Sequence, residues 1–269
     1  MTDLFKTLQS SAAPDKGSDK RLKQPSCFCV LHMIRASFMI NQFFLSTRFF
    51  KLIDSAKSDG VDLGSMPKSW QVQVAYYQGR YHMYNNDFEK ARAELRRAFQ
   101  LCYKDNFHNK QRILRYLVPV EMLIGRFPSQ KLLKQYELAE YNDMVEACLN
   151  GDMPAFEAAM EKNMDALIYS GVFTTVEQIR LLTLCNFVRR VALAVQSAPE
   201  CQKQNKPNII SLQYLFHPLR NWDNELDLDE VECLLANLIG NGMIKGYISH
   251  EQRVLVLSKN MKDAFPTLE

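Results

Sequence analysis

The sequence lacks any long, uninterrupted hydrophobic run. A membrane-spanning helix needs about 20 consecutive apolar residues. The most apolar stretch, Cys27 to Phe50, is interrupted by His32, Arg35, Asn41, Gln42 and Arg48. The sequence therefore predicts a buried helical segment here and no membrane span. A composition of 47% hydrophobic and 23% charged residues is that of a folded globular protein.

The marks of a secreted protein are also missing. The seven cysteines are an odd number and are scattered, without the close, regular spacing of a disulfide scaffold. A basic stretch before Cys27 imitates a signal peptide, but Arg35 follows where small residues for cleavage would stand. The sequence therefore indicates a reducing compartment.

Signatures of metal binding and catalysis are absent as well. Cys27, Cys29 and His32 could suggest a metal site, but two cysteines one residue apart diverge on a helix and no second ligand pair follows. The sequence contains no glycine-rich phosphate loop, no His-Glu-x-x-His segment and no Gly-x-Ser-x-Gly turn, and its five histidines are dispersed. We therefore expect no metal, no cofactor, no catalytic residue, no small-molecule substrate and no enzymatic activity.

Strand signals are almost missing from the first two hundred residues, where apolar residues recur at helical spacing instead. Short polar turns separate successive helices, which predicts antiparallel helical hairpins. In one hairpin Gly79, Ala91 and Ala98 lie where a tetratricopeptide-like repeat places small residues at a close helix crossing. The expected helices cover residues 28–38, 41–57, 70–84, 87–103, 110–124, 129–136, 141–150, 154–170 and 175–197.

The last quarter of the chain has a different pattern. Asp227 can cap a helix while Glu230, three residues later, completes a capping box, and residues 240–242 can end that helix. Two short aliphatic segments follow, 243–249 and 253–258, joined by a polar turn. A helix followed by a two-stranded β-hairpin is the second half of a winged helix.

These patterns predict a mostly α-helical protein, a TPR-like solenoid of helical hairpins that ends in a winged helix with a C-terminal two-stranded β-hairpin. We expect a poorly ordered N-terminal segment at 1–26, a helical-repeat part at 27–206 and a winged-helix part at 207–269. The helix expected at 175–197 is apolar enough to pack against both parts. We therefore expect no flexible linker between them.

The net charge of +3 is unevenly distributed along the chain. Basic residues clearly outnumber acidic ones between Lys68 and Lys134, whereas acidic residues outnumber basic ones from Pro207 onward. Because phosphate binding depends on lysine and arginine, the acidic winged end is not expected to hold nucleic acid alone.

Five short segments carry a family resemblance. They are Tyr76-Tyr77-Gln78-Gly79-Arg80, Asn86-Asp87-Phe88, Tyr116-Leu117-Val118-Pro119-Val120, Leu235-Ala236-Asn237-Leu238-Ile239 and Lys245-Gly246-Tyr247-Ile248-Ser249-His250. Together they resemble the PCI family, whose members are scaffold subunits of the proteasome lid, the signalosome and translation-initiation assemblies. The resemblance is strongest to the Thp-type branch and covers roughly Met33 to the C-terminus. Members of this branch carry several more helices upstream, so the chain looks like a short form.

The resemblance implies a non-enzymatic subunit of the nuclear complex that couples transcription to messenger RNA export. The implied partners are a Sac-type PCI scaffold protein and a small acidic Dss-type protein. It also implies RNA or DNA bound jointly with the partner's winged helix, and a nuclear, pore-associated location with some protein in the cytoplasm. Carried onto this chain, the nucleic-acid surface would include Lys245, Tyr247, His250 and Arg253.

Alternatives remain open for each group of candidate residues. The basic residues Arg92, Arg96 and Arg97 could hold an acidic partner or RNA, or could pair with nearby acids on their own helix. The aromatic residues Tyr214, Phe216 and Trp222 could contact a partner or belong to the core. The alternative function is a scaffold subunit of a signalosome- or proteasome-lid-like assembly without direct nucleic-acid binding.

Overall fold

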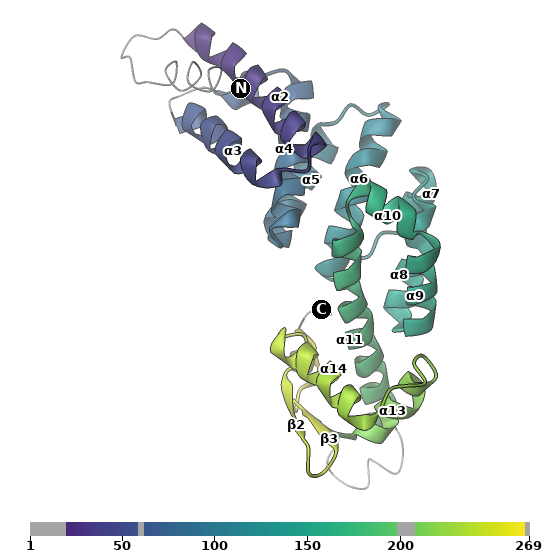
Figure 1. Cartoon of the computed structure of the whole chain (residues 1–269). Helices are drawn as coiled ribbons and strands as arrows, with labels where there is room; N and C mark the ends of the chain where they lie inside the picture. Colours follow the sequence, from purple (N-terminus) through teal and green to yellow (C-terminus); the bar gives the residue numbers. More distant parts are fainter. Residues whose placement is uncertain (1–19, 59–61, 198–207, 267–269) are drawn as a thin grey trace. The chain divides into compact units, whose positions relative to one another are not determined.

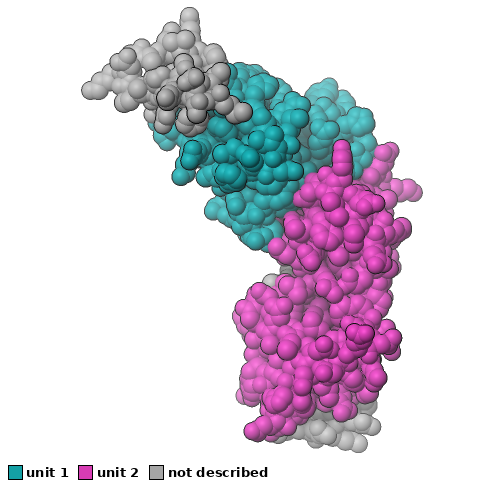
Figure 2. Space-filling model, viewed as in Figure 1, with its two compact units in different colours: residues 1–117 teal, residues 118–269 magenta. Residues whose placement is uncertain are grey.

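The computed structural model describes residues 20–58, 62–197 and 208–266, which are mostly helical (Figure 1). The chain divides into two compact units, Met1–Leu117 and Val118–Glu269 (Figure 2). Helical hairpins in both units and a winged helix with a small sheet near the C-terminus confirm the predicted fold class. In the described part of the chain, none of the helices has both the length and the apolar character needed to cross a bilayer.

The first unit is built from helical hairpins. It contains α2 (Lys20–Met39), α3 (Phe43–Ser58), the 3-10 turn η1 (Leu63–Ser65), α4 (Lys68–Tyr84), α5 (Phe88–Leu101) and the first part of α6 (Phe107–Leu123). Helix α2 begins at Lys20, inside the segment predicted to be poorly ordered. The earlier part of that segment, residues 1–19, lies outside the described residues.

Close packing of small residues joins α4 to α5. Ala91 and Ala98 are fully buried, and a Cβ added to Gly79 would lie only 2.5 Å from Cγ of Leu95. The predicted small-residue crossing is therefore confirmed. Asp87 begins α5 by accepting a hydrogen bond from the Lys90 backbone N–H.

Aromatic side chains fill the core between α2, α3 and α4. The Trp70 indole donates a hydrogen bond to the Cys27 carbonyl at 3.3 Å, and Phe43 stacks on Tyr84 with ring centroids 4.4 Å apart. The guanidinium of Arg80 lies over the Tyr116 ring at 4.5 Å, which also brings α6 onto α4. This packing explains why the apolar stretch after residue 27 is core rather than membrane-spanning.

The second unit continues with short helices and one long helix. They are the end of α6, α7 (Gln130–Gln135), the 3-10 turn η2 (Ala139–Tyr141), α8 (Asn142–Asn150), α9 (Met153–Lys162), α10 (Met164–Ser170) and α11 (Phe173–Ser197). The single helix predicted over 154–170 was wrong, because the structure has two helices separated at Asn163. The Asn163 side chain donates to the Ala159 carbonyl at 2.8 Å and so competes with the helical backbone.

The winged module follows α11 and contains one more strand than predicted. Its elements are β1 (Ile209–Ser211), α13 (Leu212–Arg220), α14 (Leu228–Gly240), β2 (Gly246–Ser249), β3 (Val254–Leu257) and α15 (Met261–Ala264). The three strands form an antiparallel sheet in the order β1-β3-β2, with Leu255 paired to Ile210 on one side and to Ile248 on the other. The predicted hairpin is present, and β1 extends it.

Helix α11 lies against α13 of the winged module (Figure 1), and one hydrophobic core joins the two. Leu184, Cys185 and Val188 from α11 are buried in the same cluster as Leu235 of α14 and Leu255 of β3. The packing of this helix against the winged module was predicted from its apolar composition and is confirmed. The domain boundary predicted at 206/207 lies outside the described residues.

Candidate partner and nucleic-acid interface

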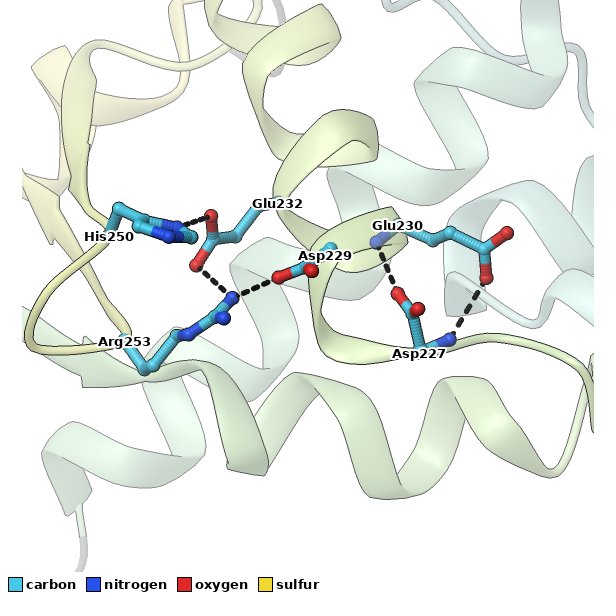
Figure 3. Close-up of polar contacts among 6 residues, drawn as sticks. All are labelled: Asp227, Asp229, Glu230, Glu232, His250 and Arg253. Carbon is cyan, nitrogen blue, oxygen red and sulfur yellow. Dashed lines mark hydrogen bonds and ion pairs between the residues drawn. The ribbon is translucent and has the colours of Figure 1, made fainter.

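The start of α14 is held by the predicted capping box (Figure 3). The Asp227 carboxylate accepts a hydrogen bond from the Glu230 backbone N–H at 2.8 Å, and the Glu230 carboxylate accepts one from the Asp227 backbone N–H at 2.9 Å. These two carboxylates also lie at the positive end of the helix dipole. The acids here therefore serve the helix start.

A second group of charges joins α14 to the turn between β2 and β3 (Figure 3). His250 Nδ1 lies 2.7 Å from Glu232 Oε2, and Arg253 donates to Glu232 Oε1 at 2.8 Å. Arg253 also forms an ion pair with Asp229. Arg253 adopts a positive φ of 52° at the end of this turn. The network therefore ties the wing to the helix that packs beneath it.

The network keeps its carboxylates ionised. The hydrogen bond from His250, together with Arg253, lowers the pKa of Glu232, and the hydrogen bond from Arg253 lowers the pKa of Asp229. Two carboxylates therefore face the Arg253 guanidinium at neutral pH. The positive charge that the sequence offered for phosphate binding at this position is already balanced within the module.

Three side chains of this network also have the types and spacing of possible metal ligands. Ligand atoms of Asp229, Glu232 and His250 lie within 4.8 Å of one another. However, the Arg253 guanidinium is bonded to both carboxylates and brings a positive charge to the position that a cation would need. We therefore interpret the group as a salt-bridge network.

The other two predicted wing residues are exposed. The Tyr247 side chain on β2 is 62% exposed, and Lys245, just before the strand, is exposed as well. Successive side chains on a strand alternate between faces, so Tyr247 lies on the face opposite Ile248, which packs against the core. Lys245 and Tyr247 are thus exposed without such contacts, whereas His250 and Arg253 are bonded to carboxylates of α14.

The predicted aromatic contacts differ in exposure. Tyr214 on α13 is 52% exposed. Phe216 and Trp222 are partly buried against the core, and the guanidinium of Arg180 lies 5.4 Å from the Trp222 ring centroid. Tyr214 can therefore meet a partner without rearrangement, whereas Phe216 and Trp222 contribute mainly to packing.

The predicted basic contacts on α5 are partly neutralised. Arg92 lies 3.5 Å from Glu89, and Arg97 lies 2.7 Å from Glu94. Both are pairs three residues apart on the helix, which was the alternative weighed for them. Arg96 is exposed on the same helix. A partner-binding role for these three residues stays a prediction.

Sequence reasoning missed a basic cleft in the first unit. Its charged side chains are Arg35, Lys68, Lys104 and Arg112, which come from α2, α4, the turn before α6 and α6 itself. The basic bias of 68–134 was the available signal, but the sequence could not show that Arg35 joins the other three.

Comparisons with known proteins agree with this architecture. Residues 221–259, from the end of α13 to just beyond β3, match the PCI domain. The chain is 32% identical to the PCI domain-containing protein 2 homolog of Caenorhabditis elegans over its whole length, and 34% identical to PCI domain-containing protein 2 of Danio rerio over 94% of its length. It is related to PCI domain-containing protein 2.

A further relative is the protein CSN12 homolog of Neurospora crassa, which is 31% identical over 87% of the chain. The chain spans 61%, 59% and 53% of the C. elegans, D. rerio and N. crassa relatives, respectively. The family resemblance that the short segments indicated is therefore confirmed.

The charge network predicts a specific acid sensitivity. Because the folded-state pKa values of Asp229 and Glu232 are lowered, their stabilising contribution is complete above the unfolded-state values of about 4 and is lost as the pH falls through the folded-state values. Glu232→Gln should therefore flatten the fall in melting temperature between about pH 5 and pH 2. Thermal unfolding followed by circular dichroism measures this.

The control for this measurement is Glu225→Gln, which removes an exposed carboxylate of the same module. Its acid profile should follow that of the unmodified protein. Parallel profiles for Glu232→Gln and the unmodified protein would show that Glu232 does not contribute to the acid sensitivity.

Proposed function

We propose that the protein is a non-enzymatic scaffold subunit of a nuclear PCI complex that couples transcription to messenger RNA export. The observation that carries this proposal is the winged module built on α11 through one core, with Tyr247 and Lys245 exposed on the wing. Such a module presents a docking face in a fixed orientation relative to α11. The relatives support the assignment to PCI scaffolds.

The partners in this proposal are a Sac-type PCI scaffold protein and a small acidic Dss-type protein. RNA or DNA binds to a surface that this winged helix shares with its partner's. The paired state of His250 and Arg253 supports a shared surface, because this wing alone supplies little uncompensated positive charge. The proposed location is the nucleus, associated with the pore, with some protein in the cytoplasm.

The alternative is a scaffold subunit of a signalosome- or proteasome-lid-like assembly that does not bind nucleic acid. The acidic balance of the sequence from Pro207 onward favours it. The two functions differ in their partners and in whether nucleic acid contributes to the complex.

Purification of the tagged protein from nuclease-treated cells tests the assembly. We expect a Sac-type scaffold and a Dss-type protein to remain bound, since protein contacts hold the complex together. Recovery of signalosome or lid subunits in their place would support the alternative and contradict the export assignment. Recovery of the protein as a monomer would contradict both.

The shared nucleic-acid surface is tested on the purified complex with the double variant Lys245→Glu/Tyr247→Ala. Loss of one phosphate contact and one stacking contact should weaken binding to single-stranded RNA about tenfold or more. Lys131→Glu is the matched control, because Lys131 is an exposed lysine on α7. Fluorescence anisotropy gives both affinities, and equal affinities for the two variants would contradict a role for the wing.

Reversal of Arg253 would be a poor test of the same surface. A glutamate at this position would place three carboxylates together and break the link between α14 and the β2–β3 turn. Lost binding would then report a damaged module instead of a lost phosphate contact.

A further inference from the structure

The first unit contains a cleft whose volume is about 660 Å³. Its walls come from α2, α4, the end of α5, the turn between α5 and α6, and the first half of α6. Ligand-binding clefts have volumes of about 300–1,000 Å³, so its size suits a small ligand or a short stretch of a polymer. It lies entirely within the first unit and is separate from the winged module.

The cleft is lined by four cations. Arg35, Lys68, Lys104 and Arg112 are all exposed, and the residues described as lining the cleft include no aspartate or glutamate. Among the described residues, no salt bridge joins any of these four to a carboxylate. The positive charge of the cleft is therefore not balanced by carboxylates in the described part of the chain. By contrast, Arg92 and Arg97 on α5 and Arg253 on the wing are paired with carboxylates.

Aromatic and amide groups lie among these cations. Tyr76 and Tyr77 meet edge to face with ring centroids 5.1 Å apart, and Tyr103 is 73% exposed at the rim. Asn109 adds a side-chain amide that both donates and accepts hydrogen bonds, and Asn106, whose Oδ1 accepts from the Asn109 backbone N–H at 3.2 Å, adds amide donors. Flat exposed rings and amides are the groups that hold unpaired bases.

The Tyr77 hydroxyl lies within the electrostatic influence of two of the four cations, Arg35 and Arg112. Burial raises the pKa of Tyr77, whereas the nearby charges of Arg35 and Arg112 act in the opposite direction. The net shift is upward, so the hydroxyl stays protonated and can donate a hydrogen bond at neutral pH. Side chains from α2, α4 and α6 thus surround one point in the cleft.

We propose that this cleft binds single-stranded RNA, with phosphates held by the four cations and a base stacked on Tyr103. An acidic peptide would use the cations and could pair its backbone with the amides, but its carboxylate side chains offer no flat group to stack on the exposed Tyr103 ring. RNA supplies both the negative charge and the flat bases. This site is separate from the wing surface, and it does not need the partner that completes the wing surface.

The test measures binding of fluorescein-labelled decauridylate to the full chain by anisotropy at several salt concentrations. Lys104→Glu/Arg112→Glu should raise the Kd at least tenfold and reduce the salt dependence, since each lost phosphate contact lowers the slope by about 0.7. Tyr103→Ala keeps the charge and should raise the Kd about fivefold or more through lost stacking.

The matched control is Arg48→Glu/Lys51→Glu, which reverses two exposed charges on α3 of the same unit. The Kd of this control should change less than about twofold if binding is local to the cleft. A loss equal to that of the cleft variant would overturn the proposal in favour of nonspecific attraction. Circular dichroism melting of each variant establishes that the fold is kept, and Tyr103→Ala decides the result if the double variant does not fold.

Two further results separate this proposal from its competitors. Decaglutamate that binds the cleft while decauridylate does not would overturn it and assign the site to an acidic protein. A loss with the wing variant Lys245→Glu/Tyr247→Ala and none with the cleft variant would overturn the cleft proposal while supporting the wing.

Discussion

Replacement of Gly151 by alanine is expected to destabilise the second unit by about 2–5 kcal/mol. Gly151 ends α8 in the left-handed conformation with a φ of 63°. An added Cβ would lie 2.5 Å from the Phe187 backbone nitrogen and 2.6 Å from its Cα. These atoms belong to the backbone of α11 and cannot rotate away, so α8 and α11 would have to separate. Urea unfolding followed by circular dichroism measures the loss.

Gly240→Ala is the matched control for this experiment. Gly240 is the last residue of α14, and no neighbouring atom lies within 4 Å of the Cβ position. Alanine has the higher helix propensity, so this substitution should change stability by less than about 1 kcal/mol, in the stabilising direction. Similar losses for both variants would show that close approach at Gly151 is not the cause.

The second large effect is expected for Leu255→Ala, at about 2–5 kcal/mol. Leu255 is fully buried on the central strand β3, between Ile210 and Ile248, in the core that also holds α11. The truncation leaves a cavity beneath both neighbouring strands. Because α11 shares this core, we expect α11 and the winged module to unfold in one transition at a lower denaturant concentration.

Hydrogen exchange read by mass spectrometry tests this coupling directly. Amides in α11 and in β3 should lose protection together in Leu255→Ala. Leu193→Ala is the control, because Leu193 lies on α11 but is 43% exposed, and it should cost less than about 1 kcal/mol. Loss of protection in β3 alone would show that the module opens independently of α11.

The sequence predicted the elements whose signals are local. The capping box of α14 depends on Asp227 and Glu230, three residues apart, and the crossing of α4 and α5 depends on small residues at fixed spacing. Helical periodicity then located most of the remaining helices within a few residues. Such signals are contained in one turn of helix, so a single sequence reveals them.

The features that sequence reasoning missed depend on distant contacts. Strand β1 has only three residues and exists because β3 offers it an open edge. The pairing of Arg253 with Glu232 joins residues 21 positions apart and follows from how the wing folds over α14. The basic cleft likewise needs Arg35 beside α6. For the wing and the cleft, composition indicated the charged residues but not which side chains would lie beside them.

The network on the wing has a consequence for selectivity. A polyanion that reaches for Arg253 must first displace Asp229 and Glu232, so it exchanges one anionic ligand for another. Such an exchange releases little net free energy, so phosphate groups that are not otherwise bound by the protein would gain almost nothing from it. Arg253 therefore binds an anionic ligand only when Asp229 and Glu232 move away from it.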